Sequence, residues 1–231
     1  MGNNQNKHTF DDFKGQLYAK GNKNTEQLMK YVNSREFNLL VDTTNGFNGL
    51  MYVISENREE LANIMINNGS NTILVSFVSR HTPLLLAIHS HMTKTASKLI
   101  SMDCNPYNRD KDGNNAFMLA CIKGMPTIAF TIWTKYGSND CRIHNSNHDT
   151  QLILACSSGL EDVALNILQI FTYVSDINSV NRYGQCAKDY AITNNLNKVI
   201  SRIIEIEQFT GVTQSYTPRQ LDAAPPAYEN K

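Results

Sequence analysis

The chain has 231 residues, of which 41% are hydrophobic, and its 21 Lys and Arg balance its 21 Asp and Glu. Without net charge it has no global field to attract nucleic acid, so the composition argues against a nucleic-acid-binding protein. The polar N-terminus, the short apolar runs and five cysteines without zinc spacing predict a reduced, cytoplasmic protein that holds no metal.

The N-terminal region begins with a polar segment, residues 1–8, which we expect to be flexible. Its start, Met1-Gly2-Asn3-Asn4-Gln5-Asn6, resembles an N-myristoylation signal on Gly2. One acyl chain binds membranes only marginally, so we expect membrane association only if Gly2 is acylated and a second signal contributes. Charged residues interrupt the apolar positions that follow, and we therefore interpret residues 9–41 as a capping unit.

A small residue recurs at a nearly constant interval in the region that follows. Val53, Ala87, Ala120, Ala155 and Ala191 are separated by 34, 33, 35 and 36 residues. Each lies within a short apolar segment that comes after a turn, and a second segment with apolar residues at helical spacing follows it. The interval divides the sequence into five units, approximately residues 42–75, 76–108, 109–143, 144–179 and 180–207.

Each unit is predicted to contain two helices separated by a break. Gly124 and Gly159 mark the break in two units, and Asn57, His91 and Asn195 occupy it as poorer substitutes in the others. Residues 73–78 depart from the pattern because they are apolar where a polar loop is expected. We expect this segment to pack as a strand or against the neighbouring loop.

The interval resembles that of the ankyrin repeat, which opens its first helix with Thr-Pro-Leu-His-x-Ala. Thr82-Pro83-Leu84 keeps the start of this motif, whereas other residues replace the histidine in every unit. The resemblance covers residues 9–207 and implies an all-α solenoid of five to six helix-loop-helix units. One helix pair cannot bury its apolar face alone, so neighbouring units are expected to stack.

Ankyrin-repeat proteins bind partners along a groove formed by loop tips and first helices, so the resemblance implies a protein partner there. Phe47 and Tyr183 lie at loop tips, where an aromatic side chain either contacts the partner or folds back onto its own unit. The residues carried over by register are Phe47, His81, His89, Arg109, Lys111, Asn114, Lys123, Asp149, Ser157, Ser158, Arg182, Tyr183 and Gln185.

The sequence contains no pattern typical of an enzyme. His89 and His91 would point to different faces of a helix, so one metal ion could not easily bind both. Cys121 and Cys156 follow the central alanines and are interpreted as small core residues. Phosphate-binding loops, serine elbows and HExxH motifs do not occur. We therefore predict a non-enzymatic, monomeric protein without a cofactor.

The C-terminal segment, residues 208–231, is rich in proline and is predicted to be disordered. It contains Pro225-Pro226-Ala227-Tyr228, which is similar to the PPxY motif that WW domains bind. Paired prolines preset a polyproline II conformation, so little entropy is lost on docking. The motif predicts a WW-domain partner that contacts Pro225, Pro226 and Tyr228.

These features lead to three hypotheses about function. The first is a host-directed adaptor that binds a target in the groove and a WW-domain protein, such as a ubiquitin ligase, through the tail. The second is a masking inhibitor that resembles the inhibitors of Rel-type transcription factors. The third is a structural or budding-associated protein of a virus, located at membranes through an acylated Gly2.

Overall fold

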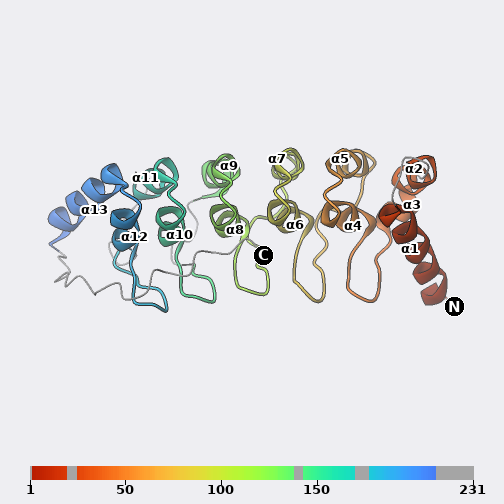
Figure 1. Cartoon of the computed structure of the whole chain (residues 1–231), viewed down its shortest axis with the longest axis horizontal. Coiled ribbons are helices and arrows are strands. Elements are labelled where there is room, and N and C mark those ends of the chain that lie inside the picture. Colours follow the sequence, from red (N-terminus) through yellow and green to blue (C-terminus); the bar gives the residue numbers. More distant parts are fainter. Residues whose placement is uncertain (1, 20–24, 138–142, 170–176, 212–231) are drawn as a thin grey trace. The chain divides into compact units, whose positions relative to one another are not determined.

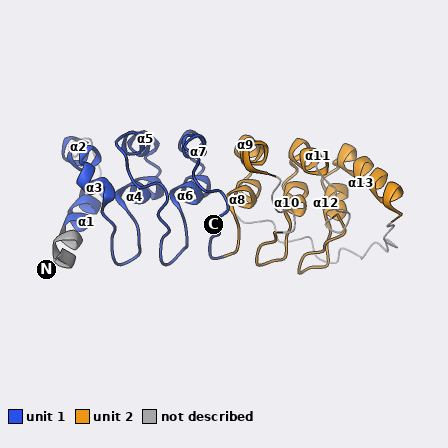
Figure 2. Ribbon diagram, turned by 180° about the vertical axis from the view of Figure 1, so that it is seen from behind, with its two compact units in different colours: residues 1–111 blue, residues 112–231 orange. Residues whose placement is uncertain are grey.

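In the computed structural model of the chain, the backbone is described for residues 2–19, 25–137, 143–169 and 177–211 (Figure 1). Regular structure in these ranges is helical, which confirms the predicted all-α class. An isolated antiparallel bridge between His144 and Thr150 is the exception there. The chain divides into two compact units, residues 1–111 and residues 112–231 (Figure 2).

The first unit, residues 1–111, consists of short helices joined by loops. Its first helix begins at Gly2, although the sequence suggested flexibility over residues 1–8. Helix α4 packs against α5 and α6, and α5 packs against α7. The helices are α1 (Gly2–Tyr18), α2 (Thr25–Asn33), α3 (Arg35–Leu39), α4 (Gly49–Ser55), α5 (Glu59–Asn67), α6 (Pro83–His89) and α7 (Thr93–Ser101).

The second unit, residues 112–231, continues the alternation of a short and a longer helix. Helix α10 packs against α8, α11 and α12, and α11 packs against α9 and α13. The last helix extends beyond residue 207, the predicted end of the domain. The helices are α8 (Ala116–Ile122), α9 (Pro126–Tyr136), α10 (Gln151–Ser157), α11 (Glu161–Gln169), α12 (Ala187–Thr193) and α13 (Asn197–Thr210).

The short helices start at the same kind of cap. The side chains of Asn48, Thr82, Asn115 and Thr150 each accept a hydrogen bond from a backbone N–H in the first turn of α4, α6, α8 and α10. At α12 the bond runs in the other direction, because the N–H of Cys186 donates to a carboxylate of the first turn. Each cap satisfies an N–H group that has no partner inside the helix, which fixes where the helix begins.

The predicted breaks between paired helices lie in the left-handed backbone region. Gly124 and Gly159 have φ values of +59° and +69°, and Asn57, His91 and Asn195 have values of +54° to +56°. Glycine adopts this conformation without a steric penalty, and asparagine does so more readily than most residues. The structure therefore confirms the position of the breaks.

The small residues that defined the sequence interval lie at the centre of the packing. Val53, Ala87, Ala120, Ala155 and Ala191 are fully buried in α4, α6, α8, α10 and α12. Within each unit the neighbouring short helices are in contact, α4 with α6, α8 with α10 and α10 with α12. The interval observed in the sequence is thus an interval of core positions.

The N-terminal helices of the first unit pack through aromatic rings. The ring of Phe37 in α3 lies 4.7 Å from that of Phe13, 5.0 Å from that of Tyr31 and 5.3 Å from that of Phe10, measured between centroids. The Phe10 ring also lies 5.9 Å from that of Tyr52 in α4. Aromatic pairs at these separations add to the free energy of burial. This cluster joins α1, α2 and α3 to α4.

Candidate partner-binding surface

Backbone hydrogen bonds join consecutive loops within each unit. In the first unit the N–H of Phe77 donates to the carbonyl of Asn45 at 2.9 Å, and the N–H of Lys111 donates to that of Ser79 at 3.3 Å. In the second unit the N–H of Ser146 donates to Asp112 at 2.9 Å, and that of Arg182 to Asn147 at 2.8 Å. The loops of each unit therefore form a connected edge rather than independent segments.

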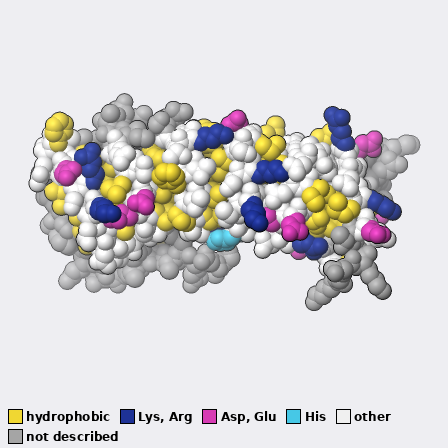
Figure 3. Space-filling view, turned by 90° about the horizontal axis from the view of Figure 1, so that it is seen from above, with side chains coloured by type: hydrophobic (Ala, Val, Ile, Leu, Met, Phe, Trp, Pro, Cys, Tyr) yellow, Lys and Arg dark blue, Asp and Glu magenta, His cyan; other side chains and the backbone are white. Residues whose placement is uncertain are grey.

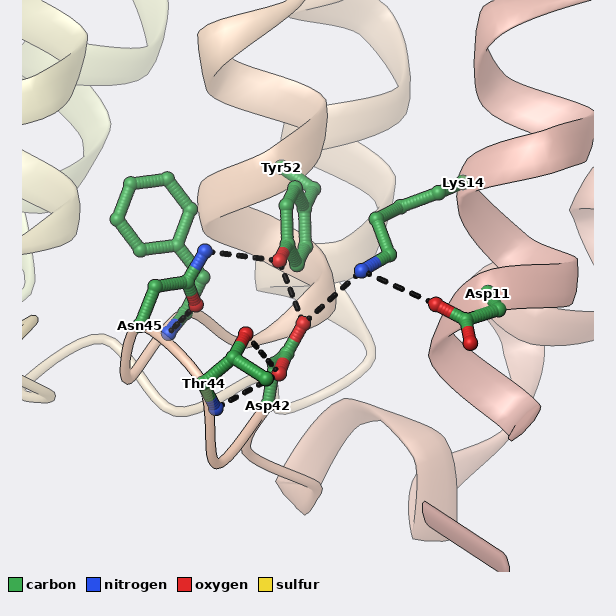
Figure 4. Close-up of polar contacts among 7 residues, drawn as sticks. Asp11, Lys14, Asp42, Thr44, Asn45 and Tyr52 are labelled. Carbon is green, nitrogen blue, oxygen red and sulfur yellow. Dashed lines mark hydrogen bonds and ion pairs between the residues drawn. The ribbon is translucent and has the colours of Figure 1, made fainter. Parts of the chain in front are cut away.

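The first loop of the first unit is fixed by a buried carboxylate (Figure 4). Asp42 accepts hydrogen bonds from the hydroxyls of Thr44 and Tyr52, both at 2.6 Å, and pairs with the ammonium of Lys14 at 3.1 Å. The amide of Asn45 donates to the Tyr52 hydroxyl at 2.9 Å. Because Lys14 belongs to α1 and Tyr52 to α4, this cluster ties the N-terminal helix to the loop.

The cluster shifts the pKa values of its members. Burial raises the pKa of Asp42, but the bonds from Thr44, Tyr52 and Lys14 outweigh it, so the net pKa lies well below its ordinary value of 3.8. Burial and the hydrogen bond to Asp42 raise the pKa of Tyr52 to about 12. Both shifts indicate that the cluster favours an ionised carboxylate and a neutral phenol.

Replacing Asp42 with asparagine should destabilise the first unit by about 1–2 kcal/mol at neutral pH, because charge-assisted hydrogen bonds become neutral ones. The folded pKa of Asp42 lies below the unfolded value of 3.8, so its contribution is present above pH 4 and is lost as the pH falls below it. Urea unfolding followed by circular dichroism should thus show a wild-type advantage that shrinks as the pH falls below about 4.

The control for this prediction is Asp11→Asn. Asp11 lies 3.4 Å from the same lysine, but its side chain is half exposed, so its removal should change stability little. An equal loss in both variants, or a constant difference for Asp42→Asn across this pH range, would contradict the assignment.

The loops of the second unit are held by a row of buried side chains. The amide of Asn145 donates to Asn114 at 3.0 Å and to Asp149 at 3.3 Å, and the amide of Asn181 donates to Asp149 at 2.9 Å. Tyr190 in α12 accepts from the Asn181 amide at 3.0 Å. Because each of these bonds satisfies a polar group that lies away from water, the row fixes three consecutive loops.

Tyr52 and Tyr190 make equivalent hydrogen bonds in the two networks. Tyr190 donates its hydroxyl hydrogen to Gln185 at 2.7 Å, as Tyr52 donates to Asp42. Each hydroxyl also accepts from an asparagine amide of its own loop. Tyr52 directly precedes Val53 in the sequence, and Tyr190 directly precedes Ala191. The two tyrosines therefore occupy the same position in the repeated interval, and each binds the loop before its own helix.

Three of the residues predicted to face a partner are buried. Asn114, Asp149 and Gln185 are members of the network described above and lie inside the loops of the second unit. Their polar groups are used to hold the loops. They therefore position the surface from within instead of forming part of it.

The remaining predicted residues differ in exposure. Phe47 is half buried and its ring lies 5.2 Å from that of Tyr52, so it folds back onto its own unit. Tyr183 is 53% exposed. The rings of His81 and His89 lie 5.6 Å apart. Those with exposed side chains are His89, Lys111, Arg182 and Tyr183, and those that are half buried are Phe47, His81, Arg109, Lys123, Ser157 and Ser158.

The apolar segment 73–78 forms no strand and instead contacts the neighbouring loop, which was the second alternative expected for it. The N–H of Phe77 donates to Asn45 and its ring lies against Gly46, while Ile73, Phe77 and Val78 remain 72%, 66% and 75% exposed. The apolar run in a loop position predicted the contact with the neighbouring loop, but it did not predict how much of these side chains stays exposed. A loop tip offers these side chains too little neighbouring surface to be covered, so they remain at the surface.

Charged side chains of both signs are mixed on the face seen in Figure 3. Lys and Arg lie among Asp, Glu and neutral side chains over the described residues there, in keeping with the balanced composition. Among the described residues of each unit, charges of both signs therefore lie near one another on that face.

The described cysteines are core residues. Cys104, Cys121, Cys156 and Cys186 are buried, and burial raises the pKa of the Cys121 and Cys156 thiols. A protonated, buried thiol is a poor nucleophile and metal ligand. In the described ranges no three His, Cys, Asp or Glu side chains come close enough to hold a metal ion.

Two of the predicted features lie where the structure gives no side-chain detail. The PPAY motif with Pro225, Pro226 and Tyr228 falls outside the described residues, as does the environment of Gly2 at the start of α1. No helix in the described part of the chain has the length and hydropathy to cross a bilayer. The chain matches no model of a known protein family and no curated protein sequence.

Proposed function

We propose that the chain is a non-enzymatic ankyrin-type binding protein that acts as an adaptor between two proteins. One partner binds the exposed loop and helix surface, and the other binds the PPAY segment. The observation that carries this proposal is the recurrence of the same loop connection at the interval seen in the sequence.

The loop connections recur at an interval typical of ankyrin repeats. The donors Phe77, Lys111, Ser146 and Arg182 are 34, 35 and 36 residues apart, close to the intervals between the buried small residues. Paired helices joined by a left-handed break, with projecting loops linked to one another, are what an array of such repeats requires. These features support the repeat interpretation without a sequence match.

The exposed residues at the loop tips favour a protein partner. Arg182 and Tyr183 lie side by side in sequence on one exposed turn, with their loop fixed by the Asn181 side chain. Tyrosine and arginine are enriched among the residues that dominate binding energy. A turn that is already ordered loses little entropy when a partner binds it.

The PPAY segment supports a second partner of a different kind. Its prolines and tyrosine match what WW domains bind, and it lies beyond the last described helix, α13. The motif follows the helical units in the sequence, so a WW domain would contact residues other than those of the loops. This separation is the reason for proposing an adaptor rather than a masking protein.

The experiment uses the full-length chain and a panel of immobilised WW domains of ubiquitin ligases. We expect binding by the wild type and loss of binding by Tyr228→Ala, because the tyrosine fills one of the two pockets of the domain. Biolayer interferometry measures the binding of the wild type and of Tyr228→Ala to each domain. Tyr183→Ala, which removes an exposed tyrosine from a described loop, should bind the WW domains like the wild type.

Failure of the wild-type chain to bind any domain of the panel would refute the adaptor. So would equal binding by Tyr228→Ala.

A further inference from the structure

The last helix pair of the second unit leaves apolar side chains exposed. Helices α12 and α13 lie at one end of the helices described for that unit (Figure 2). Ile192, directly after the buried Ala191, is 44% exposed, and Ile204, nine residues after the break at Asn195, is 37% exposed. The equivalent residues of earlier pairs are almost fully buried, namely Ile54, Cys121 and Cys156 in short helices and Ile66, Trp133 and Leu168 in longer ones. Each of those pairs packs against a following pair of its own unit.

The two exposed isoleucines lie near one another. Lys188 of α12 pairs with Glu207 of α13 at 2.7 Å, and both side chains are largely buried. Side chains three or four residues apart lie on the same side of a helix. Ile192 comes four residues after Lys188, and Ile204 comes three residues before Glu207, so the ion pair brings the isoleucines to one level of the helix pair. We call the surface formed by Ile192 and Ile204 the end face.

The end face has the register of a surface that receives a further short helix. Within the second unit α8 packs against α10, and α10 packs against α12. The short helices α4, α6, α8, α10 and α12 each span seven residues. Their cap residues, Asn48, Thr82, Asn115, Thr150 and Cys186, are 34, 33, 35 and 36 residues apart. A helix that covers the end face is therefore expected to start at a similar interval after Cys186.

Residues 217–224, which lie outside the described residues, have the sequence signals of such a helix. Thr217-Pro218 lies 31 residues after Cys186 and repeats the Thr82-Pro83 pair that starts α6. Threonine is a favourable cap, and proline is favourable as the first helical residue. Helices usually end at or before the residue that precedes a proline, here Pro225. The sequence thus predicts a helix of at most seven residues, the length of the other short helices.

The predicted helix has the polarity of a terminal element. Leu221 and Ala224 lie three residues apart and share one side, whereas Arg219, Gln220 and Asp222 are polar. Asp222 takes the place of the small residue that is buried in the other short helices, so it argues against burial on all sides. One apolar side is enough to cover one neighbour, and terminal elements of repeat arrays need a polar outer face.

The place of this segment in the chain favours it over a second copy as the occupant of the end face. Helix α13 ends at Gly211, whose φ of +68° is the left-handed conformation that turns the chain at a helix end. The Lys188–Glu207 pair sets the start of α12 beside the end of α13, so residues 212–216 need to span about 10 Å, the spacing of packed helices. They reach up to about 17 Å. So short a tether gives an effective concentration in the millimolar range.

We propose that residues 217–224 form a short helix that packs Leu221 against the end face and closes the second unit. This cap removes Ile192 and Ile204 from water, as a following helix pair does for their equivalents. It replaces, for these residues, the disorder that the proline-rich composition of residues 208–231 predicted. The cap ends before Pro225, so the PPAY segment stays outside it and the WW-domain proposal can fail independently.

The test is methyl NMR spectroscopy of the full-length chain with labelled isoleucine and leucine methyl groups. We expect nuclear Overhauser contacts from Leu221 to Ile192 or Ile204 that persist on dilution. Amides of residues 218–224 should exchange about tenfold more slowly in the wild type than in Leu221→Asp, since burial of one leucine accounts for such a factor. Ile192→Ser changes the other side of the contact and should have the same effect.

Two control variants separate the cap from its surroundings. Gln220→Asp adds the same charge to a polar position of the same segment and should keep both the methyl contacts and the slow exchange. Tyr228→Ala should keep them as well, because Tyr228 follows the cap in the sequence. Leu221→Asp lies outside the PPAY motif, so it should bind WW domains like the wild type. Loss of the cap and loss of WW binding are thereby distinguishable.

Three results would overturn the proposal. The first is a wild-type spectrum without contacts between Leu221 and the end face, and the second is equal exchange of the 218–224 amides in the wild type and Leu221→Asp. The third is contacts at the end face that vanish on dilution together with a dimer in sedimentation velocity, which would assign this face to a second copy of the chain. Ile192 is partly exposed, so circular dichroism should show that Ile192→Ser remains folded.

Discussion

Phe37→Ala is expected to destabilise the first unit by about 3–5 kcal/mol, the range for removal of a buried aromatic side chain. Phe37 is almost fully buried, and its ring contacts those of Phe10, Phe13 and Tyr31 from two other helices. The cavity left by the substitution would lie where α1, α2 and α3 meet, so the three helices would lose their common contact.

Amide hydrogen exchange on the full-length chain is the suitable measurement, because it resolves stability by segment. Amides of α2 and α4 should lose protection in Phe37→Ala. Leu39→Ala is the matched control, since Leu39 lies on the same helix but is largely exposed. If Phe37→Leu, which keeps most of the apolar volume, lost as much protection as Phe37→Ala, the cause would not be the cavity.

Asp149→Ala is expected to destabilise the second unit by about 2–4 kcal/mol. Its carboxylate is 1% exposed and accepts hydrogen bonds from the amides of Asn145 and Asn181, which belong to different loops. The substitution leaves two buried donors without this acceptor, and each unsatisfied group costs about 1–3 kcal/mol.

Trp133 provides the measurement for this variant. It is the one tryptophan of the chain, and it lies buried in α9 of the second unit, so its fluorescence during urea unfolding reports on that unit. Asp149→Asn keeps one acceptor oxygen, so it should lose less stability than Asp149→Ala. Asp162→Ala removes an exposed carboxylate from α11 and should leave the midpoint unchanged. A midpoint for Asp149→Ala equal to that of Asp162→Ala would show that the row of bonds adds no stability.

The helices could be predicted from the sequence because their signals are local. Apolar residues at helical spacing, such as Leu61, Ile64 and Met65, lie in α5, and the breaks at Gly124 and Gly159 have the expected backbone conformation. Caps and breaks depend on neighbours within a few residues. The sequence of each segment by itself is therefore enough to predict its helix, cap and break.

The surface could not be predicted as well because it depends on distant contacts. Asp149 has the polarity of a surface residue, yet it is buried through a partner 32 residues away, Asn181. Phe77 has the polarity of a core residue, yet it is 66% exposed because its ring meets only the neighbouring loop at Gly46. Polarity indicates the environment that a side chain prefers, and only the arrangement of neighbouring loops determines the environment that it receives.

The buried row of the second unit separates two tasks that loops often combine. Asn145, Asp149 and Asn181 hold the loops from inside, while Ser146, Arg182 and Tyr183 are displayed at their tips. Substitutions at the tips can therefore be made without disturbing the framework. Under the proposed function, such a scaffold would diverge in specificity at the tips while the asparagine and aspartate positions stay under constraint.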